Sequence, residues 1–145
     1  VFSLRGGKKT QVLDAKEGFY YHGIDHNHNG SLLAVSCNHL IQLKDLRTAS
    51  TIMEWRAHDG QISCVKFGHD ETTIVSAGAD GYVKEWSAHA PGKELFSKKM
   101  TSGGEDVTMD VALSPIGRHV IACSGGHYAA HLINPLDSRQ PQLVG

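Results

Sequence analysis

Residues 57–86 read AHDGQISCVKFGHDETTIVSAGADGYVKEW, and the rest of the chain is organised around them. Residues 61–67 and 73–77 are runs of strand-forming side chains, and residues 82–86 form a third run. The dipeptide Asp80-Gly81 separates the last two runs and favours a tight turn in which both central residues have positive φ. This stretch therefore predicts three consecutive strands.

Composition is that of an ordinary globular protein. Hydrophobic residues make up 40% of the 145 residues and charged residues 20%, which argues against disorder and allows one domain with its own core. A formal net charge of −1 gives no electrostatic basis for nucleic-acid binding. The three cysteines are well separated and odd in number, which favours reduced thiols in a cytosolic protein. No apolar run approaches the roughly 18 residues of a membrane span, so we expect at most peripheral contact with a membrane.

The central pattern occurs three times along the chain. The segments HGIDHNHNGSLLAVS, SCVKFGHDETTIVSA and MDVALSPIGRHVIAC each place a strand, a polar turn and a second apolar strand in the same order. Their anchor residues Ile24, Val65 and Val111 lie about 41 and 46 residues apart, close to the period of four-stranded propeller blades. Two further strand-like runs, 1–4 and 10–13, come before the first copy. Strand-like sequence at both ends leads us to expect a piece of a longer protein.

The middle copy resembles a WD repeat of the WD-repeat β-propeller family. That family's pattern is a Gly-His pair, a Val-x-Phe strand, a Ser-containing strand, an Asp-Gly turn and a Trp-Asp ending. The matching residues here are His58, Val65 and Phe67, Ser76, Asp80-Gly81 and Trp86, whereas Ala57 and Ser87 replace the Gly and the last Asp. The flanking copies are degenerate, since Lys44-Asp45 stands at the Trp-Asp place of the first.

The resemblance implies an all-β fold, a partial propeller of about three four-stranded blades from a probable seven. We expect the blades to cover about residues 19–56, 57–100 and 101–145, with residues 1–15 ending a preceding blade. It also implies a structural hydrogen-bond tetrad in which Asp80 accepts from His58, His58 bonds the Ser76 hydroxyl, and Ser76 accepts from the Trp86 indole.

The same residue types invite a hydrolase interpretation. A catalytic triad needs an exposed, activated Ser, a base within reach and an oxyanion hole. Ser76 instead sits in mid-strand between Val75 and Ala77, with no nucleophile-elbow sequence around it. The structural tetrad is therefore favoured and no enzyme activity is expected.

Other side chains are candidates for binding. On the resemblance, the interaction face would include Asp59, Gln61, Ser63 and Ala79. Trp55-Arg56 adds an aromatic and an Arg, which suit an interface anchor, although packing of Trp55 against the neighbouring blade is the favoured alternative.

His22, His26 and His28 suggest a metal site, with His39 as a further candidate ligand. However, these histidines flank the turn sequence Asn29-Gly30, and no Cys-x-x-Cys pair accompanies them. Solvated turn histidines are favoured, so we expect no metal and no cofactor.

About half of the chain shows a narrower resemblance, carried by the runs HNGSLL at 28–33 and MEWRAH at 53–58 together with Asp70-Glu71 and Trp86. These are similar to the C-terminal propeller of the WD-repeat protein 91 family. That resemblance implies an endosomal adaptor and Rab effector that regulates phosphatidylinositol 3-kinase activity and early-to-late endosome conversion. The implied partners are a Rab GTPase and phosphatidylinositol 3-kinase complex components, at the cytoplasmic side of endosomes. The alternative is a propeller that recognises modified peptides or phosphoinositide.

Overall fold

The computed structural model describes residue 18 and residues 20–68, 71–100, 109–113, 120–124, 129–133 and 142–144, with side chains described up to residue 100 and at 110–113. Every regular element in these ranges is a strand. The strands are β1 (Tyr21–His26), β2 (Leu32–Cys37), β3 (Leu40–Asp45), β4 (Thr51–Arg56), β5 (Ile62–Phe67), β6 (Thr73–Gly78), β7 (Tyr82–Ser87), β8 (Glu94–Lys99), β9 (Met109–Leu113), β10 (Val120–Ser124), β11 (Ala129–Ile133) and β12 (Gln142–Val144). The expected strands at 1–4 and 10–13 lie outside the described residues. No helix of the described ranges is long and apolar enough to cross a membrane.

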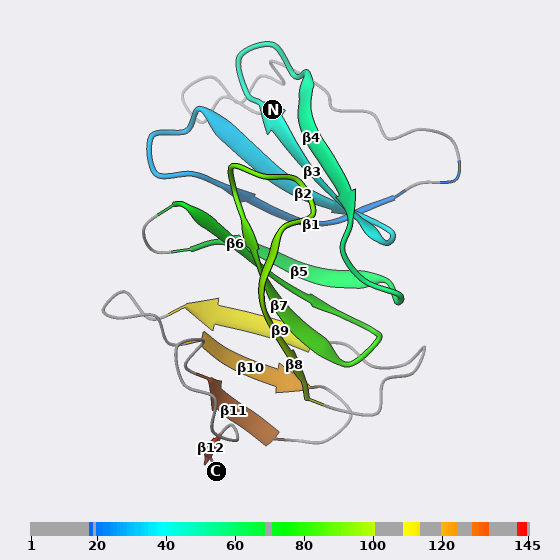
Figure 1. Ribbon diagram of the computed structural model, residues 1–145, viewed down its shortest axis with the longest axis vertical. Coiled ribbons are helices and arrows are strands. Elements are labelled where there is room, and N and C mark those ends of the chain that lie inside the picture. The colour runs from blue at the N-terminus through cyan, green and yellow to red at the C-terminus, as the bar shows by residue number, and fades with distance from the viewer. Residues whose placement is uncertain are drawn as a thin grey trace, which may run out of the picture.

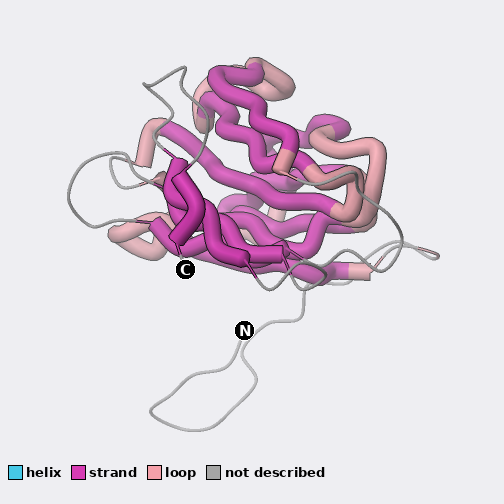
Figure 2. Tube along the Cα trace, turned by 90° about the horizontal axis from the view of Figure 1, so that it is seen from below, coloured by secondary structure: helices cyan, strands magenta, loops and turns pink. Residues whose placement is uncertain are grey.

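The strands form three antiparallel sheets of four, which we call the first (β1–β4), second (β5–β8) and third (β9–β12) sheets. Each sheet is built from strands consecutive in sequence, and the three follow one another along the long axis of the molecule (Figure 1). Figure 2 shows the same layers from below, with loops at both ends of the strands. Contacts between β1 and β5, and between β5 and β9, bring the inner strands of successive sheets together.

Burial along the strands follows from this layering. All six residues of β6 are buried because both faces of the second sheet are covered. The outer strand β4 is mostly exposed and β8 alternates between exposed and half-buried residues. Buried residues on both faces therefore mark the middle strands β2 and β6, in place of the one-sided alternation of a solvent-facing sheet.

Two apolar clusters fill the seams between sheets. The seam between the first and second sheets contains Ile41, Leu43 and Trp55 from one side and Phe67 and Trp86 from the other. The two indole rings lie 5.9 Å apart at 52°. The seam between the second and third sheets is built from Cys64, Val75, Ala77, Val83 and Val111, with partly buried Phe96, Met100 and Leu113 packed against it.

The turn at Asp80-Gly81 differs from the expected one. Strand β6 ends at Gly78 and β7 begins at Tyr82, so three residues connect them. Gly81 has a φ of 86°, but Asp80 is not among the residues with positive φ, and the Gly81 N–H donates to the Gly78 carbonyl at 3.1 Å. This is the three-residue hairpin, in which a left-handed Gly follows an ordinary turn. The prediction of two positive φ values was wrong because it assumed a two-residue loop, whereas a loop of three residues needs only its last residue in the left-handed region.

Candidate interaction surface and its supporting network

Four side chains of the second sheet form one chain of hydrogen bonds. The His58 Nδ1 lies 2.9 Å from the Asp80 Oδ1 and 3.0 Å from Oδ2. On the other side of the ring, the His58 Nε2 lies 2.7 Å from the Ser76 Oγ. The Trp86 indole N–H donates to the same Oγ at 2.9 Å. The network thus joins the loop that enters β5, the strands β6 and β7, and the turn between them.

Donors and acceptors alternate along this chain. A carboxylate only accepts, so Nδ1 carries the hydrogen that faces Asp80. With the imidazole neutral, Nε2 accepts the Ser76 hydroxyl hydrogen, and the Ser76 oxygen remains free to accept from Trp86. His58 is 1% exposed, Ser76 0% and Trp86 4%. Each polar atom in this buried set therefore has a protein hydrogen-bond partner in place of the water that it loses on burial.

Asp80 also organises the backbone around it. Its carboxylate accepts from the Asp59 N–H and from the Tyr82 N–H, both at 3.1 Å. Burial raises the pKa of Asp80, but the hydrogen bond from His58, together with the two backbone N–H groups, outweighs burial and holds the pKa below its ordinary value of 3.8. The surrounding groups therefore stabilise the ionised form of the Asp80 carboxyl group.

Two glycines make room for the network, and sequence reasoning missed both. A Cβ on Gly78 would lie 2.8 Å from the His58 ring, and one on Gly60 would lie 2.5 Å from the Asp80 nitrogen. Real Cβ atoms do not approach other atoms so closely. Gly60 lies two residues after His58 and Gly78 two residues before Asp80, and this spacing was the signal available in the sequence.

Ser76 is not placed to act as a nucleophile. Its side chain is fully buried in mid-strand, with the His58 ring on one side and the Trp86 indole on the other. A substrate carbonyl has no path to the Oγ, and the hydroxyl hydrogen already serves the network. The buried thiol of Cys64 is equally unsuited, because burial raises its pKa to about 11.

The network supports one end of the first two sheets, which we call the entry end because β1 and β5 both begin there. It consists of residue 20, the β2–β3 turn at 38–39, the loop 57–61 and the turn 79–81. Of the expected interaction residues, Arg56, Asp59 and Gln61 are exposed at this end, whereas Ser63 and Ala79 are half-buried. Arg56 and Asp59 form an exposed ion pair of 3.6 Å.

Trp55 does not belong to this surface. It is 7% exposed and lies in the seam between the first and second sheets, next to Trp86. Its assignment to the interaction face was wrong, and the alternative of packing against the neighbouring blade holds. The cause is the alternation of β4, which turns Trp55 inward and leaves Arg56 exposed.

The first sheet adds residues that sequence reasoning did not assign to this surface. Tyr20 is 68% exposed, and the exposed His22 ring lies 2.6 Å from the Gln61 Nε2. The carbonyl of Asn38, whose φ is 54°, accepts from the Ile62 N–H at 2.9 Å. Loops of two neighbouring sheets thus form one continuous surface. Only the stacking of the sheets brings His22 beside Gln61.

The histidines do not gather into a metal site. His22 lies at the entry end, whereas His26 and His28 lie at the opposite end of β1, where the His26 Nδ1 is 2.7 Å from the Asn27 carbonyl. Within the described ranges, no group of three or more His, Cys, Asp or Glu side chains is placed to hold a metal ion.

Comparison with known proteins agrees with the repeat seen in the second sheet. Residues 49–87 match the family described as "WD domain, G-beta repeat". The matched residues comprise the outer strand β4 of the first sheet and β5–β7 of the second. The chain belongs to the WD-repeat family. The match includes all four members of the hydrogen-bond network, so it falls on the repeat that the sequence resembled.

Relatives of this WD-repeat chain share a common name. It is 30% identical to WD repeat-containing protein 91 of Danio rerio over 115 residues, which covers 68% of the chain and 16% of that protein. It is 37% identical to the Gallus gallus protein over 77 residues and 33% identical to the Dictyostelium discoideum homolog over 88 residues. The chain spans only 10% and 12% of these last two proteins.

A solved structure has the same arrangement of sheets. A chain in the crystal structure of a mitotic checkpoint complex superposes with a TM-score of 0.83 at 15% identity, over 97% of the WD-repeat chain and 41% of that chain. At this identity the likeness concerns the fold alone. Together with the WD repeat, it establishes the three stacked sheets as blades of a partial β-propeller.

Proposed function

We propose that this chain is a non-catalytic scaffold for protein–protein interaction and that partners dock on its entry end. The observation that carries the proposal is the continuous surface made there by two blades, held together by the bond between His22 and Gln61. Loops on a rigid β scaffold are the usual place for binding residues, because the strands fix them while the sequence of the loops stays free to vary.

The chemistry of the surface suits a protein partner. The side chains of Tyr20 and Arg56 are largely exposed, at 68% and 61%. Tyr and Arg are enriched among residues that dominate binding energy, since each combines a large contact area with hydrogen bonding. Asp59, whose side chain is 93% exposed, and Gln61 add polar groups that can set the orientation of a partner. Because both signs of charge are present, the surface fits a mixed protein surface better than a polyanion.

A narrower role follows from the relatives. We propose that the protein is an endosomal adaptor that binds a Rab GTPase and components of the phosphatidylinositol 3-kinase complex at the cytoplasmic face of endosomes. There it would regulate phosphatidylinositol 3-kinase activity and early-to-late endosome conversion. The similarity to WD repeat-containing protein 91 in three distant organisms supports this role.

The experiment is a binding assay between the whole protein and purified Rab GTPases loaded with GTP analogue or GDP. We expect binding to the GTP form, reduced at least about tenfold by Tyr20→Ala and by Arg56→Glu, as for interface residues of these types. Arg47→Glu is the matched control, because Arg47 is exposed in the β3–β4 turn at the opposite end of the first sheet and should leave binding unchanged.

The outcomes separate the two levels of the proposal. One outcome is that no Rab GTPase binds, while proximity labelling in cells identifies other proteins whose labelling is lost in Tyr20→Ala and Arg56→Glu. In that case the protein is an interaction scaffold, but its partner is not a Rab GTPase. Should Arg47→Glu weaken partner binding as strongly as Arg56→Glu, the entry end is not the docking surface. Salt-sensitive binding to phosphoinositide vesicles, without any protein partner, would favour the lipid-recognising alternative.

A further inference from the structure

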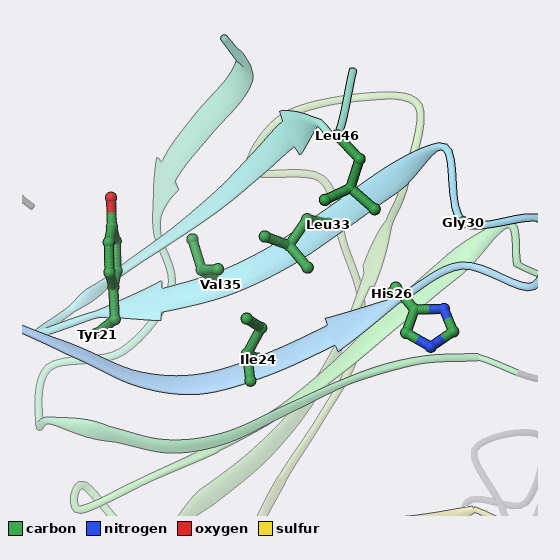
Figure 3. Close-up of a pocket in the computed structure, with 7 residues that line it drawn as sticks. All are labelled: Tyr21, Ile24, His26, Gly30, Leu33, Val35 and Leu46. Atoms are coloured by element: carbon green, nitrogen blue, oxygen red, sulfur yellow. The ribbon is translucent and has the colours of Figure 1, made fainter. Parts of the chain in front are cut away.

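Four large apolar side chains are exposed in the described part of the chain, namely Tyr20, Ile24, Ile52 and Leu95. Tyr20 belongs to the entry end. Ile24 lines an apolar groove of about 510 Å³ on the first sheet, on the face that points away from the second sheet (Figure 3). This is the face on which the expected preceding blade would pack, so the fold accounts for it. Ile52 and Leu95 remain, and both lie on outer strands.

Ile52 and Leu95 occupy the same place in neighbouring blades, 43 positions apart. Each is the second residue of its outer strand and the extra residue of a β-bulge. In the first sheet, Thr51 and Met53 pair with consecutive residues of β3, so Ile52 has no partner in the ladder. Leu95 is skipped in the same way on β8. A bulge can re-aim one side chain, and here it leaves two aliphatic side chains 53% and 47% exposed.

The position of these bulges limits the kind of partner. Successive sheets meet at their inner strands, so β4 and β8 lie on the outer rim of the molecule. An outer strand with a regular edge could pair with a strand of another protein, but a bulge interrupts the edge and blunts such pairing. The two aliphatic side chains therefore suit a partner that does not extend the sheets.

The second of these outer strands is basic. Strand β8 and the residue before it read KELFSKK, with three lysines and one glutamate, in a chain whose formal net charge is −1. Lys93 and Lys99 are exposed and Lys98 is half-buried. The Glu94 Oε1 is already paired with the Lys84 Nζ at 3.2 Å. Among the described residues, no carboxylate forms an ion pair with the other three lysines, so their charge is available to an external anion.

This chemistry fits an anionic bilayer better than a protein. Protein interfaces are enriched in aromatic residues and Arg and depleted in Lys, and the entry end has that composition in Tyr20 and Arg56. The outer strands instead combine single aliphatic side chains with ammonium groups. Proteins bind to membrane surfaces through this combination, because apolar side chains enter the boundary between headgroups and acyl chains while lysines attract anionic headgroups.

We propose that the outer strands β4 and β8 dock on a bilayer that contains anionic lipids. Ile52 and Leu95 enter the boundary between headgroups and acyl chains, and Lys93, Lys98 and Lys99 contact the lipid phosphates. The entry end is made of loops at the ends of the strands, so it stays available to a protein partner. The inference does not depend on which partner the entry end binds.

Cosedimentation of the whole protein with phosphatidylcholine vesicles, with and without phosphatidylserine, tests the proposal. We expect binding only when phosphatidylserine is present, and weaker binding at higher salt because the charges are screened. Lys99→Gln should weaken binding about fivefold, and its combination with Lys98→Gln at least about tenfold, since each removes one attractive charge. Asn29→Asp is the matched control. It also lowers the net charge by one unit, in the exposed turn between β1 and β2, and Asp can still accept from the Ser31 N–H.

Two neutral variants test the insertion of the aliphatic side chains. Leu95→Ser and Ile52→Ser leave the net charge unchanged, and each should weaken vesicle binding about three- to tenfold because less apolar surface leaves water. Tyr20→Ala, which is expected to weaken binding of a protein partner, should leave vesicle binding unchanged. Circular dichroism confirms that each variant is folded, and Leu95→Ala or Ile52→Ala replaces a serine variant that is not.

Three results would overturn the proposal. The first is absence of binding to vesicles with phosphatidylserine, and in that case a protein partner lost in Lys98→Gln and Lys99→Gln would make the outer strands a protein-docking surface. The second is vesicle binding that Asn29→Asp weakens as much as Lys99→Gln, or that the serine variants leave intact. The third is loss of vesicle binding in Tyr20→Ala, which would place the lipid at the entry end.

Discussion

At the scale of single residues, Ser76 is the centre of the buried network. Its oxygen lies within hydrogen-bonding distance of the His58 Nε2 at 2.7 Å and the Trp86 Nε1 at 2.9 Å. One hydroxyl thus serves two side chains that are themselves buried. Removing it leaves two polar atoms without partners, whereas removing an exposed hydroxyl leaves only water contacts to rearrange.

We expect Ser76→Ala to lower the free energy of unfolding by about 1–3 kcal/mol, the cost of leaving buried polar groups unsatisfied. The measurement is urea denaturation followed by intrinsic fluorescence. Ser97→Ala is the control, because Ser97 is exposed on β8 of the same sheet and should change stability by less than about 0.5 kcal/mol. Equal stability of both variants would contradict a structural role for the network.

The Asp80 carboxylate gives the network a pH dependence. Because the folded pKa lies below 3.8, the charge of Asp80 contributes stability above that value, and the contribution is lost as the pH falls through the folded pKa. We expect the difference in unfolding free energy between the unaltered protein and Asp80→Asn to be complete above about pH 5 and to shrink toward about pH 3. Denaturation midpoints across this range provide the measurement.

Asp59→Asn is the natural comparison for the pH series. The Asp59 side chain is 93% exposed, so its replacement should give a small difference that does not vary over the same range. A difference for Asp80→Asn that grows as the pH falls would have the opposite sign to the one predicted here.

At the scale of elements, the hairpin of β6 and β7 and the loop before β5 are adapted to each other. The turn of three residues holds Asp80 over the His58 ring, and Gly78 leaves space for that ring. His58 in the loop and Asp80 in the turn are 22 positions apart in the sequence. The conformation of the loop and that of the turn therefore depend on each other.

Gly78→Ala should therefore destabilise the protein by about 1–3 kcal/mol, as expected for overpacking. The reason is specific, since the new Cβ would lie 2.8 Å from the His58 Cγ and Nδ1. In a His58→Ala background this clash is absent, so Gly78→Ala should cost clearly less there. A double-mutant cycle on unfolding free energies measures the coupling, and additive effects would show that the strain lies elsewhere.

At the scale of the whole molecule, polar bonds lock the first two sheets together beside the apolar seam. The Phe67 N–H on β5 donates to the Asp25 Oδ2 on β1 at 2.8 Å. The Glu71 carboxylate accepts from the His28 N–H, which joins the loops at the end opposite the entry end. These bonds fix the offset between sheets, and the offset determines which loop residues meet at the surface.

Asp25→Ala should loosen this seam without unfolding either sheet. We expect faster hydrogen exchange at the Phe67 amide and a loss of about 1–3 kcal/mol in the free energy of unfolding, because a half-buried N–H loses its acceptor. Asp45→Ala is the control, since Asp45 accepts from the Arg47 N–H within one hairpin. That variant should leave the Phe67 amide unchanged, and accelerated exchange there would mean that Asp25 has no special role.

The sequence by itself determined the strands and their order. Hydrophobic runs of strand length, broken by Gly, Asn and Asp, predicted β5, β6 and β7 to within one residue at each end. The repeat and the WD pattern predicted the all-β propeller fold and picked out His58, Ser76, Asp80 and Trp86. These features are local or recur at a fixed spacing, so they can be read along the chain.

Only the tertiary structure decided which residues share a surface. It buried Trp55, placed His22 beside Gln61, and changed the Asp80-Gly81 turn to a three-residue hairpin. It also left the groove on the first sheet, which the pattern of β1 and β2 does not reveal. The contact between His22 and Gln61 depends on how one sheet is offset from the next, and that offset is fixed by contacts between residues some 40 positions apart. A pattern read within one repeat carries no information on such contacts.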